Sequence, residues 1–313
     1  MILPAAPRIH GSEDMTSPDC VRIQLDGELA LAWKDWLDVN QDRYHIGYEL
    51  VGNSLEEHTA ACLASARSTV DRLFDEYGDI QPKRILDVGC STGFKSIALH
   101  YRFPEAEVHG IDPDDVAVSL GQTLISKLSG HERSRCPSLS VGYAERLPYP
   151  DSHFDAIVCV TVLEHVSDVR ATMVEMTRVL RPGGLLFLEA PNYLWPYEPH
   201  LRIVVPPLCP KPLMRALAHL QGAGSKAGYA AHLKLVHPFW IERMMRDLGL
   251  TWENRVVQKL DAVFAGHLDT VLQYRRGAGA LRAIERMGFA RALGWVILGL
   301  RIYPSMIYVV RRP

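Results

Sequence analysis

The chain has 313 residues, of which 48% are hydrophobic, with a formal net charge of -2 and a pI near 6.7. A chain of this length can bury one large core, or one core with a modest lid. The near-neutral charge gives no electrostatic reason to expect a nucleic-acid partner, because proteins that neutralise several phosphates usually carry a basic face.

The first 30 residues predict a mobile N-terminus without a secretory signal. Glu13, Asp14 and nearby prolines interrupt any apolar run of the kind that such a signal needs. The six cysteines form no Cys-x-x-Cys pair and lack the spacing of zinc ligands. We therefore expect reduced thiols, no metal site and a cytoplasmic protein.

A helical pattern follows over residues 31–79. Leu63, Val70, Leu73 and Phe74 recur at helical spacing on one face, while acids and arginines occupy the others. The spacing predicts helices with an inward apolar face in front of the first strand of the fold.

The most informative segment is the strand and turn over residues 84–93, which reads R-I-L-D-V-G-C-S-T-G. Its apolar residues suit a strand that is buried on both faces, as in a parallel sheet. Gly89 and Gly93 let the backbone approach a ligand at the carboxyl end of this strand. A helix is predicted to begin near Phe94, with its N-terminus directed at the same place. The arrangement indicates a site for a nucleoside-bearing cofactor.

Taken alone, the turn has competing interpretations. A nicotinamide-binding motif needs three glycines at set places, but Ser91 occupies the middle place and Ser96 lies beyond the turn. A phosphate-binding loop needs glycine followed directly by lysine, whereas Phe94 separates Gly93 from Lys95. An ordinary strand-to-helix turn is a further alternative for the isolated segment.

An acid, Asp87, precedes the glycines, and the turn then resembles the first motif of class I S-adenosylmethionine-dependent methyltransferases. In that family the turn passes over the amino-acid end of the cofactor. A second short strand, residues 108–112, ends in Asp112, and a carboxylate there can accept from both ribose hydroxyls at once. The later motifs, in order, are the lead-in 144–155, the apolar strand 156–162, the Leu-Glu-His segment 163–165, the helix end 179–184 and the strand 185–189.

This ordered series, over about residues 80–192, resembles the widespread methyltransferase domain of enzymes that act on quinones, sterols, sugars and secondary metabolites. Residues 237–250 resemble it more loosely. The resemblance implies an α/β fold, a three-layer Rossmann-like arrangement with a mostly parallel seven-stranded sheet, a helical cap and C-terminal insertions. It also implies S-adenosyl-L-methionine as cofactor, with these candidate binding residues: Asp87, Gly89, Cys90, Ser91, Gly93, Asp112, Pro113, Tyr143, Ala144, Glu145 and Thr161.

The sequence departs from the family at the adenine subsite. Many members carry an acid there that bonds the adenine amino group, whereas this chain has Gly142-Tyr143-Ala144. Because Tyr143 cannot supply a carboxylate, we expect backbone groups, the phenol or Glu145 to hold the adenine. Cys90 lies in the cofactor turn, where a small residue that fills the turn is the simpler interpretation than a nucleophile.

In the family, the helices before the first motif cover the cofactor and part of the substrate cavity. Tyr44 and Tyr48 are therefore candidates for contact with the acceptor, although aromatic residues four positions apart also form ordinary packing pairs. Residues 193–236 predict a substrate-covering insertion, because they follow the fifth strand and begin with a segment rich in proline and aromatic residues. Its candidate substrate residues, with the residue before it, are Asn192, Tyr193, Trp195 and Tyr197.

Local patterns predict the remaining elements. A short helix is expected near 212–220, a flexible point at 222–225 and an amphipathic helix over 238–248 that ends at Gly249. Strands are expected around 254–258 and at 306–310, and the resemblance to the family implies that the last strand pairs antiparallel with its predecessor. The mostly helical stretch 277–300 contains an apolar run, 292–300, that is too short to cross a bilayer. It is a core or lid helix, or alternatively an interfacial helix in contact with lipid.

The function expected from this resemblance is methyl transfer to a small-molecule acceptor, with a hydroxyl favoured over an amine or carbon. His165 is the first candidate for a general base, because in similar enzymes the Glu-His pair lies beside the reactive end of the cofactor and imidazole titrates near neutral pH. His200, in the predicted insertion, is the second. A structural role for His165, a non-catalytic cofactor-binding protein and another nucleotide-dependent enzyme such as a dehydrogenase remain alternatives. The sequence does not give the oligomeric state, and membrane contact is a minor expectation.

Overall fold

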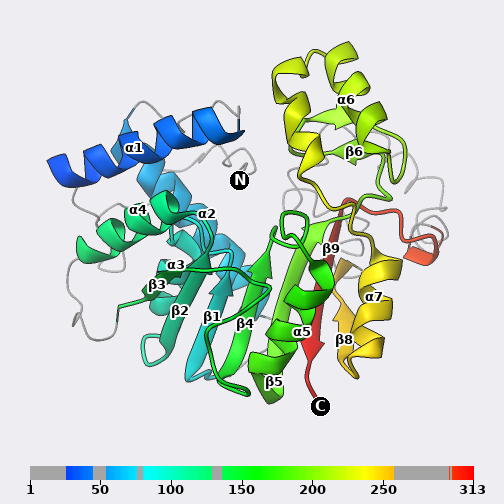
Figure 1. Ribbon diagram of the computed structural model, residues 1–313. Helices are drawn as coiled ribbons and strands as arrows, with labels where there is room; N and C mark the ends of the chain where they lie inside the picture. Colours follow the sequence, from blue (N-terminus) through cyan, green and yellow to red (C-terminus); the bar gives the residue numbers. More distant parts are fainter. Residues whose placement is uncertain (1–25, 45–53, 76–79, 129–135, 257–295, 297) are drawn as a thin grey trace, which may run out of the picture. The chain divides into compact units, whose positions relative to one another are not determined.

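The computed structural model describes residues 26–44, 54–75, 80–128, 136–256, 296 and 298–313, without the side chains of 40–44. The chain divides into two compact units, one comprising Met1–Phe187 with Arg311–Pro313 and the other Leu188–Val310. Strands form a seven-stranded sheet in the order β3-β2-β1-β4-β5-β9-β8 (Figure 1). The α/β fold with a mostly parallel sheet and flanking helices confirms the predicted class.

The first unit contains the parallel part of the sheet. Strand β1 pairs in parallel with β2 on one side and with β4 on the other, and β2 pairs in parallel with β3. The strands are β1 (Arg84–Val88), β2 (Glu107–Asp112), β3 (Ser138–Val141), β4 (Phe154–Val160) and β5 (Leu180–Pro191). The helices are α1 (Gly27–Tyr44), α2 (Leu55–Phe74), α3 (Phe94–Arg102), α4 (Asp115–Ser126) and α5 (Val169–Val179).

Side-chain caps and apolar burial explain where these helices form. The side chains of Ser54, Asp114 and Asp168 accept hydrogen bonds from backbone N–H groups in the first turns of α2, α4 and α5. Leu63, Val70, Leu73 and Phe74 of α2 are buried, as the helical spacing predicted. The Phe74 ring packs against Phe187 with centroids 4.3 Å apart. Helix α1 begins at Gly27, slightly before the predicted start of the helical cap.

The second unit continues from the end of β5 into the predicted insertion. It contains the hairpin of β6 (Tyr197–Glu198) and β7 (Ile203–Val204), helix α6 (Lys211–Leu220), the 3-10 helix η3 (Gly224–Ala231), helix α7 (Pro238–Asp247), β8 (Thr251–Asn254) and β9 (Ser305–Arg311). Helix α6 and α7 lie where the pattern predicted helices, and Gly249 after α7 has a φ of 70°. Among the described residues, no helix combines the length and apolarity needed to cross a membrane.

Several predicted boundaries were wrong. Strand β5 begins at Leu180, not at 185, because the Pro-Gly-Gly segment is not a turn but pairs with the end of β9, with Gly183 N donating to Arg312 O at 2.7 Å. At the other end of β5, Asn192 N donates to Pro304 O at 3.0 Å, so β5 and β9 run antiparallel. The strand expected at 254–258 is β8, Thr251–Asn254. The apolar run 292–300 lies mostly outside the described residues.

Candidate functional site

The carboxyl ends of the parallel strands bring the first group of candidate residues to one edge of the sheet. Residues 89–93 follow β1, Asp112 ends β2 and residues 161–165 follow β4, and these three strands are adjacent and parallel (Figure 1). In open α/β sheets, ligands bind at this edge. The strand order thus assembles segments that lie far apart in the sequence.

The turn after β1 is held in an unusual backbone conformation. Gly89, Ser91 and Gly93 all have positive φ, at 70°, 48° and 77°. The N–H groups of Gly89 and Cys90 both donate to Ile111 O, at 2.8 and 3.1 Å. A Cβ added to Gly89 would lie 2.3 Å from Cγ2 of Val162, so only glycine fits. The turn is therefore locked against both β2 and the loop after β4.

Asp112 connects the turn to the second strand. Its Oδ2 accepts from Ser91 N at 2.8 Å and its Oδ1 accepts from Asp114 N at 2.9 Å. The residue is 9% exposed, and burial raises the pKa of its carboxyl, opposed by these two backbone hydrogen bonds. Each carboxylate oxygen accepts one backbone donor and keeps a further lone pair for a ligand. Asp112 is thus preorganised to accept two hydroxyl groups.

Asp87, by contrast, lies inside the protein. Its side chain is fully buried, its Oδ2 accepts from Ser96 Oγ at 2.8 Å, and Lys95 Nζ lies 3.7 Å from its Oδ1. Lys95 Nζ also donates to Gly89 O at 3.3 Å. Burial raises the pKa of Asp87, and the nearby Lys95 charge opposes this. This geometry favours a structural role for Asp87, which stabilises the turn, over direct contact between Asp87 and a ligand.

Sequence reasoning missed Lys95 and Ser96 as partners of Asp87. One signal was available: a lysine in the first turn of α3 opposes the helix dipole and so calls for an acid nearby. The Cys90 side chain packs inward against Val118 and Leu139. Burial raises the pKa of the Cys90 thiol well above its ordinary value, which fits a small residue that fills the turn and not a nucleophile.

The segment after β3 carries the unusual adenine-subsite residues. Tyr143 is 63% exposed, whereas Ala144 is buried. Glu145 Oε1 accepts from Ser167 N at 2.6 Å and from Asp168 N at 3.4 Å, so this carboxylate holds the loop before α5. Three groups were expected to hold the adenine: backbone groups, the Tyr143 phenol and Glu145. Because Glu145 has this structural role, the phenol and the backbone are the better candidates. The exposed Pro113 directly follows Asp112.

The loop after β4 carries His165. Thr161 has a φ of 56° and its Oγ1 donates to Val160 O at 2.7 Å, which turns the chain sharply at the strand end. His165 N donates to Val162 O at 2.8 Å. The imidazole Nε2 lies 3.7 Å from Oε1 of the buried Glu164, while the imidazole itself remains accessible. An accessible imidazole beside a buried carboxylate can take up a proton and be stabilised when charged.

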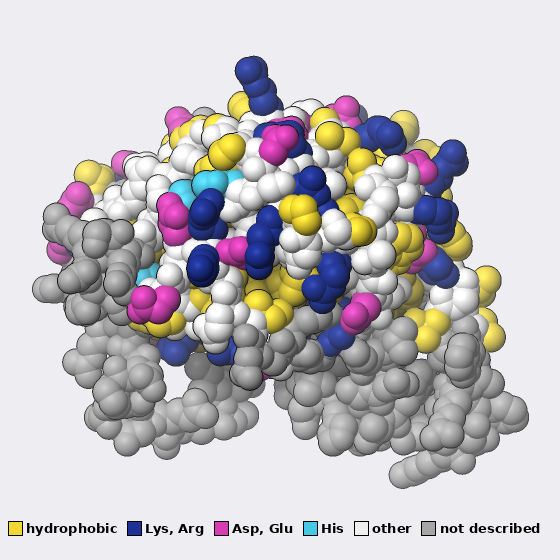
Figure 2. Space-filling model, turned by 90° about the horizontal axis from the view of Figure 1, so that it is seen from below, with side chains coloured by type: hydrophobic (Ala, Val, Ile, Leu, Met, Phe, Trp, Pro, Cys, Tyr) yellow, Lys and Arg dark blue, Asp and Glu magenta, His cyan; other side chains and the backbone are white. Residues whose placement is uncertain are grey.

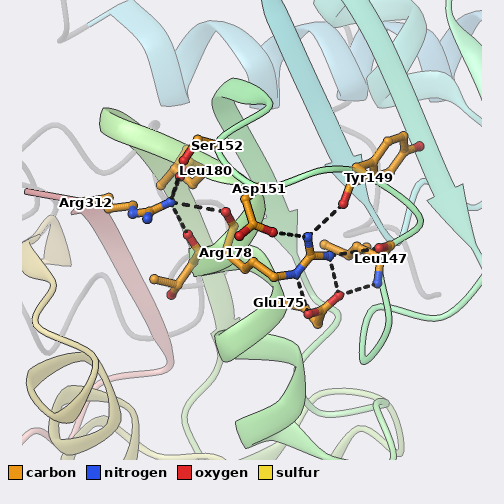
Figure 3. Close-up of polar contacts among 9 residues, drawn as sticks. Leu147, Tyr149, Asp151, Ser152, Glu175, Arg178, Leu180 and Arg312 are labelled. Carbon is orange, nitrogen blue, oxygen red and sulfur yellow. Dashed lines mark hydrogen bonds and ion pairs between the residues drawn. The ribbon is translucent and has the colours of Figure 1, made fainter.

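The lead-in to β4 is fixed by one arginine, as Figure 3 shows. Arg178 of α5 donates from Nη1 to Tyr149 O at 2.8 Å, from Nη2 to Leu147 O at 3.0 Å, and pairs through Nε with Glu175 at 2.8 Å. Glu175 in turn accepts from Leu147 N at 2.8 Å. These contacts hold the segment that follows the adenine-subsite residues.

The opposite edge of the sheet shows mixed charge. Arg181 Nε lies 2.6 Å from Asp155 Oδ1, and Asp155 Oδ2 also accepts from Arg84 N at 2.7 Å. In the view of Figure 2, Lys and Arg side chains are interspersed with Asp and Glu. This view therefore shows no broad basic field of the kind that binds a phosphate backbone.

The second unit carries further candidate residues. Asn192 is buried, its Nδ2 donates to Arg301 O and Tyr303 O, both at 2.7 Å, and its Oδ1 accepts from Leu194 N at 3.0 Å. The Asn192 amide thus links the end of β5 to the backbone of residues 301 and 303. Tyr193 is also buried, whereas Trp195 is half-buried and Tyr197 is exposed. Trp195 and Tyr197 are the accessible candidates of this set.

His200 lies beside a second buried acid. Its Nδ1 is 2.6 Å from Oε1 of Glu198, which is fully buried and also accepts from Leu201 N. The His200 ring packs near Tyr229, with centroids 5.4 Å apart. His200 is thus oriented by a carboxylate within the second unit. Of the cap candidates, Tyr44 ends α1 with an undescribed side chain, and Tyr48 lies outside the described residues.

A glycine turn after β1, an acid at the end of β2 and this strand order define a nucleoside-binding α/β domain. Residues 86–188 match the family model of the methyltransferase domain. This region therefore carries a methyltransferase domain, in agreement with the class I S-adenosylmethionine-dependent type that the motifs predicted.

Known relatives match part of the chain. The chain is 36% identical over 114 residues to the uncharacterized methyltransferase C1B3.06c of Schizosaccharomyces pombe, covering 36% of this chain and 41% of that protein. It is 27% identical over 194 residues to the O-methyltransferase rstn1 of Aspergillus nomiae, covering 59% of this chain and 82% of that one. The chain thus spans less than half the length of the first of these relatives. The crystal structure of the [4+2]-cyclase SpnF aligns over 85% of each chain at 20% identity with a TM-score of 0.47.

Proposed function

We propose that this chain transfers a methyl group from S-adenosylmethionine to a hydroxyl group of a small molecule. The observation that carries the proposal is the link between Asp112 and the glycine turn. Ser91 N–H and Asp114 N–H fix the two carboxylate oxygens at 2.8 and 2.9 Å, at the sheet edge where ligands of such folds bind. A carboxylate set in this way suits the paired hydroxyls of a ribose.

The residues present fit the cofactor. Asp112 would hold the ribose, the turn 89–93 would lie along the amino-acid end, and Tyr143 offers an exposed ring and neighbouring backbone groups to the adenine. Ser91 takes the place of the middle glycine of a nicotinamide-binding motif, with a φ of 48°, and its N–H donates to Asp112. This turn therefore differs from the motif that binds the pyrophosphate of a nicotinamide cofactor. When bound, the cofactor supplies an electrophilic methyl group on a positively charged sulfur.

The chain's own contribution to catalysis is alignment and proton removal. Holding nucleophile and methyl carbon in line can supply much of the rate enhancement. His165 is proposed to take the proton of the acceptor hydroxyl, because its imidazole is accessible and lies 3.7 Å from the buried Glu164 carboxylate. Glu145, through Ser167 N at 2.6 Å, holds the loop that presents His165.

A neutral hydroxyl needs its proton removed as it attacks, whereas an amine can lose it later. The presence of His165, with His200 as an alternative base in the second unit, therefore favours oxygen as acceptor atom. Relatives of the chain include proteins named as O-methyltransferases and as N-methyltransferases. N-methylation is the second candidate, and it is supported if loss of both histidines leaves turnover intact.

The test combines cofactor binding by calorimetry with methyl transfer from tritiated cofactor to a panel of phenols, sugars and amines. His165→Ala should lower turnover by about a hundredfold and leave cofactor affinity nearly unchanged. Turnover of the parent enzyme on a hydroxyl acceptor should rise with pH through the imidazole titration, and the variant should lose this rise. His232→Ala, an exposed histidine of the second unit, is the matched control.

Other outcomes separate the alternatives. If His165→Ala lowers affinity and turnover together, His165 belongs to the cofactor pocket and His200 becomes the leading base. Cofactor binding without transfer to any acceptor would favour a non-catalytic binding protein. Binding of a nicotinamide cofactor in its place would contradict the proposal altogether.

A further inference from the structure

The insertion after β5, residues 193–236, differs in charge from the rest of the chain. It contains five lysines and arginines, Arg202, Lys211, Arg215, Lys226 and Lys234, and a single acid, Glu198. Glu198 is fully buried, so it adds nothing to the surface. The insertion thus carries a net charge of +4, although the whole chain carries -2.

The same segment exposes large apolar side chains. Val204, Leu208, Leu213 and Leu220 are 63%, 40%, 45% and 81% exposed. Single exposed apolar residues are normal on protein surfaces, but several within one short segment indicate a binding surface. We call these four residues, with Arg202 and Arg215, the insertion surface.

The elements of the insertion surface are held together by specific contacts. Met214 and Ala218 form the buried face of α6, so Leu213 and Leu220, two helical turns apart, both project outward. Gln221, the C-cap of α6, accepts from Val204 N at 2.9 Å and donates to Val204 O at 2.8 Å. Val204 therefore lies beside the end of the helix that carries Leu220, and α6 and the hairpin are drawn together in Figure 1.

We propose that the insertion surface docks on an anionic phospholipid membrane. Projecting leucines can enter the head-group region of the bilayer, while the arginines and lysines of the same segment attract negative lipids. Charge complementarity favours this partner, because the one acid of the segment is buried. A two-fold contact between copies of the chain would instead bring two insertions of net charge +4 together. The proposal does not depend on the methyl-transfer reaction.

The test is co-sedimentation of the full chain with vesicles. We expect binding to vesicles of phosphatidylcholine mixed with phosphatidylglycerol and much weaker binding to phosphatidylcholine alone, with a loss at high salt. Leu220→Glu should lower the membrane partition coefficient about tenfold. Arg202→Gln and Arg215→Gln should each lower it about fivefold.

The controls are exposed residues of the same types elsewhere in the chain. Leu31→Glu on α1, at 58% exposure, and Arg170→Gln on α5 should leave vesicle binding unchanged. Circular dichroism and cofactor calorimetry confirm that each variant is folded, and the arginine variants test the proposal even if Leu220→Glu does not fold. Equal binding to both vesicle types, or equal losses from Leu31→Glu, would overturn the proposal. A fall in oligomer mass on Leu220→Glu, without vesicle binding by the parent, would assign the surface to a second copy of the chain.

Discussion

Replacing Gly89 with alanine tests the proposed locking of the cofactor turn. Two separate costs apply at this position. The φ of 70° is unfavourable for any residue with a Cβ, by about 1–2 kcal/mol. The added Cβ would also lie 2.3 Å from Val162 Cγ2, an overlap that a packed site relieves only by shifting, at about 1–3 kcal/mol. The expected total loss in the free energy of unfolding is therefore about 2–5 kcal/mol.

The chain offers a control for the backbone term alone. Gly183 has a φ of 75°, and nothing lies within 4 Å of the Cβ that would be added there. Gly183→Ala should therefore cost only about 1–2 kcal/mol. Urea unfolding of both variants measures the difference, and calorimetry with S-adenosylmethionine should show reduced affinity for Gly89→Ala only.

A double variant isolates the contact with the loop after β4. Val162→Ala removes the methyl groups that the new Cβ would meet. The double variant should therefore lose about 1–3 kcal/mol less free energy of unfolding than the sum of the losses of the two single variants. If the losses simply add, or if Gly89→Ala costs no more than Gly183→Ala, the turn is not locked against Val162 and the argument for a preformed site is wrong.

Three further predictions follow from charge and burial. Asp112→Ala should weaken S-adenosylmethionine binding by about 2–4 kcal/mol, measured by calorimetry, and unchanged affinity would remove the ribose assignment. Burial lowers the pKa of His58, so at about pH 6 the unfolded chain binds a proton at His58 more readily than the folded chain does. The free energy of unfolding should therefore fall as the pH drops below about 6.5. Urea titrations at about pH 7.5 and 5.5 should show that His58→Gln reduces this dependence. Because burial raises the pKa of the Cys90 thiol, iodoacetamide at neutral pH should alkylate the half-buried Cys136 and spare Cys90. Equal labelling of the two cysteines in mass spectrometry would contradict the packed position of Cys90.

The turn and its acids were predictable because their signals are local. Asp87, the glycines and Asp112 lie within strands and turns whose pattern fixes their place at the carboxyl edge of a parallel sheet. The helices α6 and α7 were predictable for the same reason, from apolar spacing and flanking proline or glycine. In each case the residues that determine the structure are neighbours in the sequence.

The supporting contacts could not be predicted, because they join residues that are distant along the chain. Glu145 reaches Ser167 and Arg178 reaches Leu147, in each case across more than 20 residues. The start of β5 was missed for a similar reason, since Gly183 belongs to the strand through its hydrogen bond with Arg312 near the C-terminus. The place of Asn192 after the fifth strand also suggested contact with an acceptor, whereas its Nδ2 donates to the backbone oxygens of Arg301 and Tyr303.

Asp112 has a structural task as well as its proposed ligand contact, and this affects how a mutation there should be interpreted. Asp112 accepts from Ser91 N and Asp114 N, and Glu145 accepts from Ser167 N, so each carboxylate fixes a loop before any ligand arrives. Removing the Asp112 carboxylate would lose the proposed ribose contact and would also free backbone donors in a partly buried place, which costs about 1–3 kcal/mol by itself. Comparing Asp112→Asn, which keeps one acceptor oxygen, with Asp112→Ala separates the two effects. Because the oxygens of Asp112 that order the turn are the ones proposed to bind the ribose, loop order and cofactor affinity should change together.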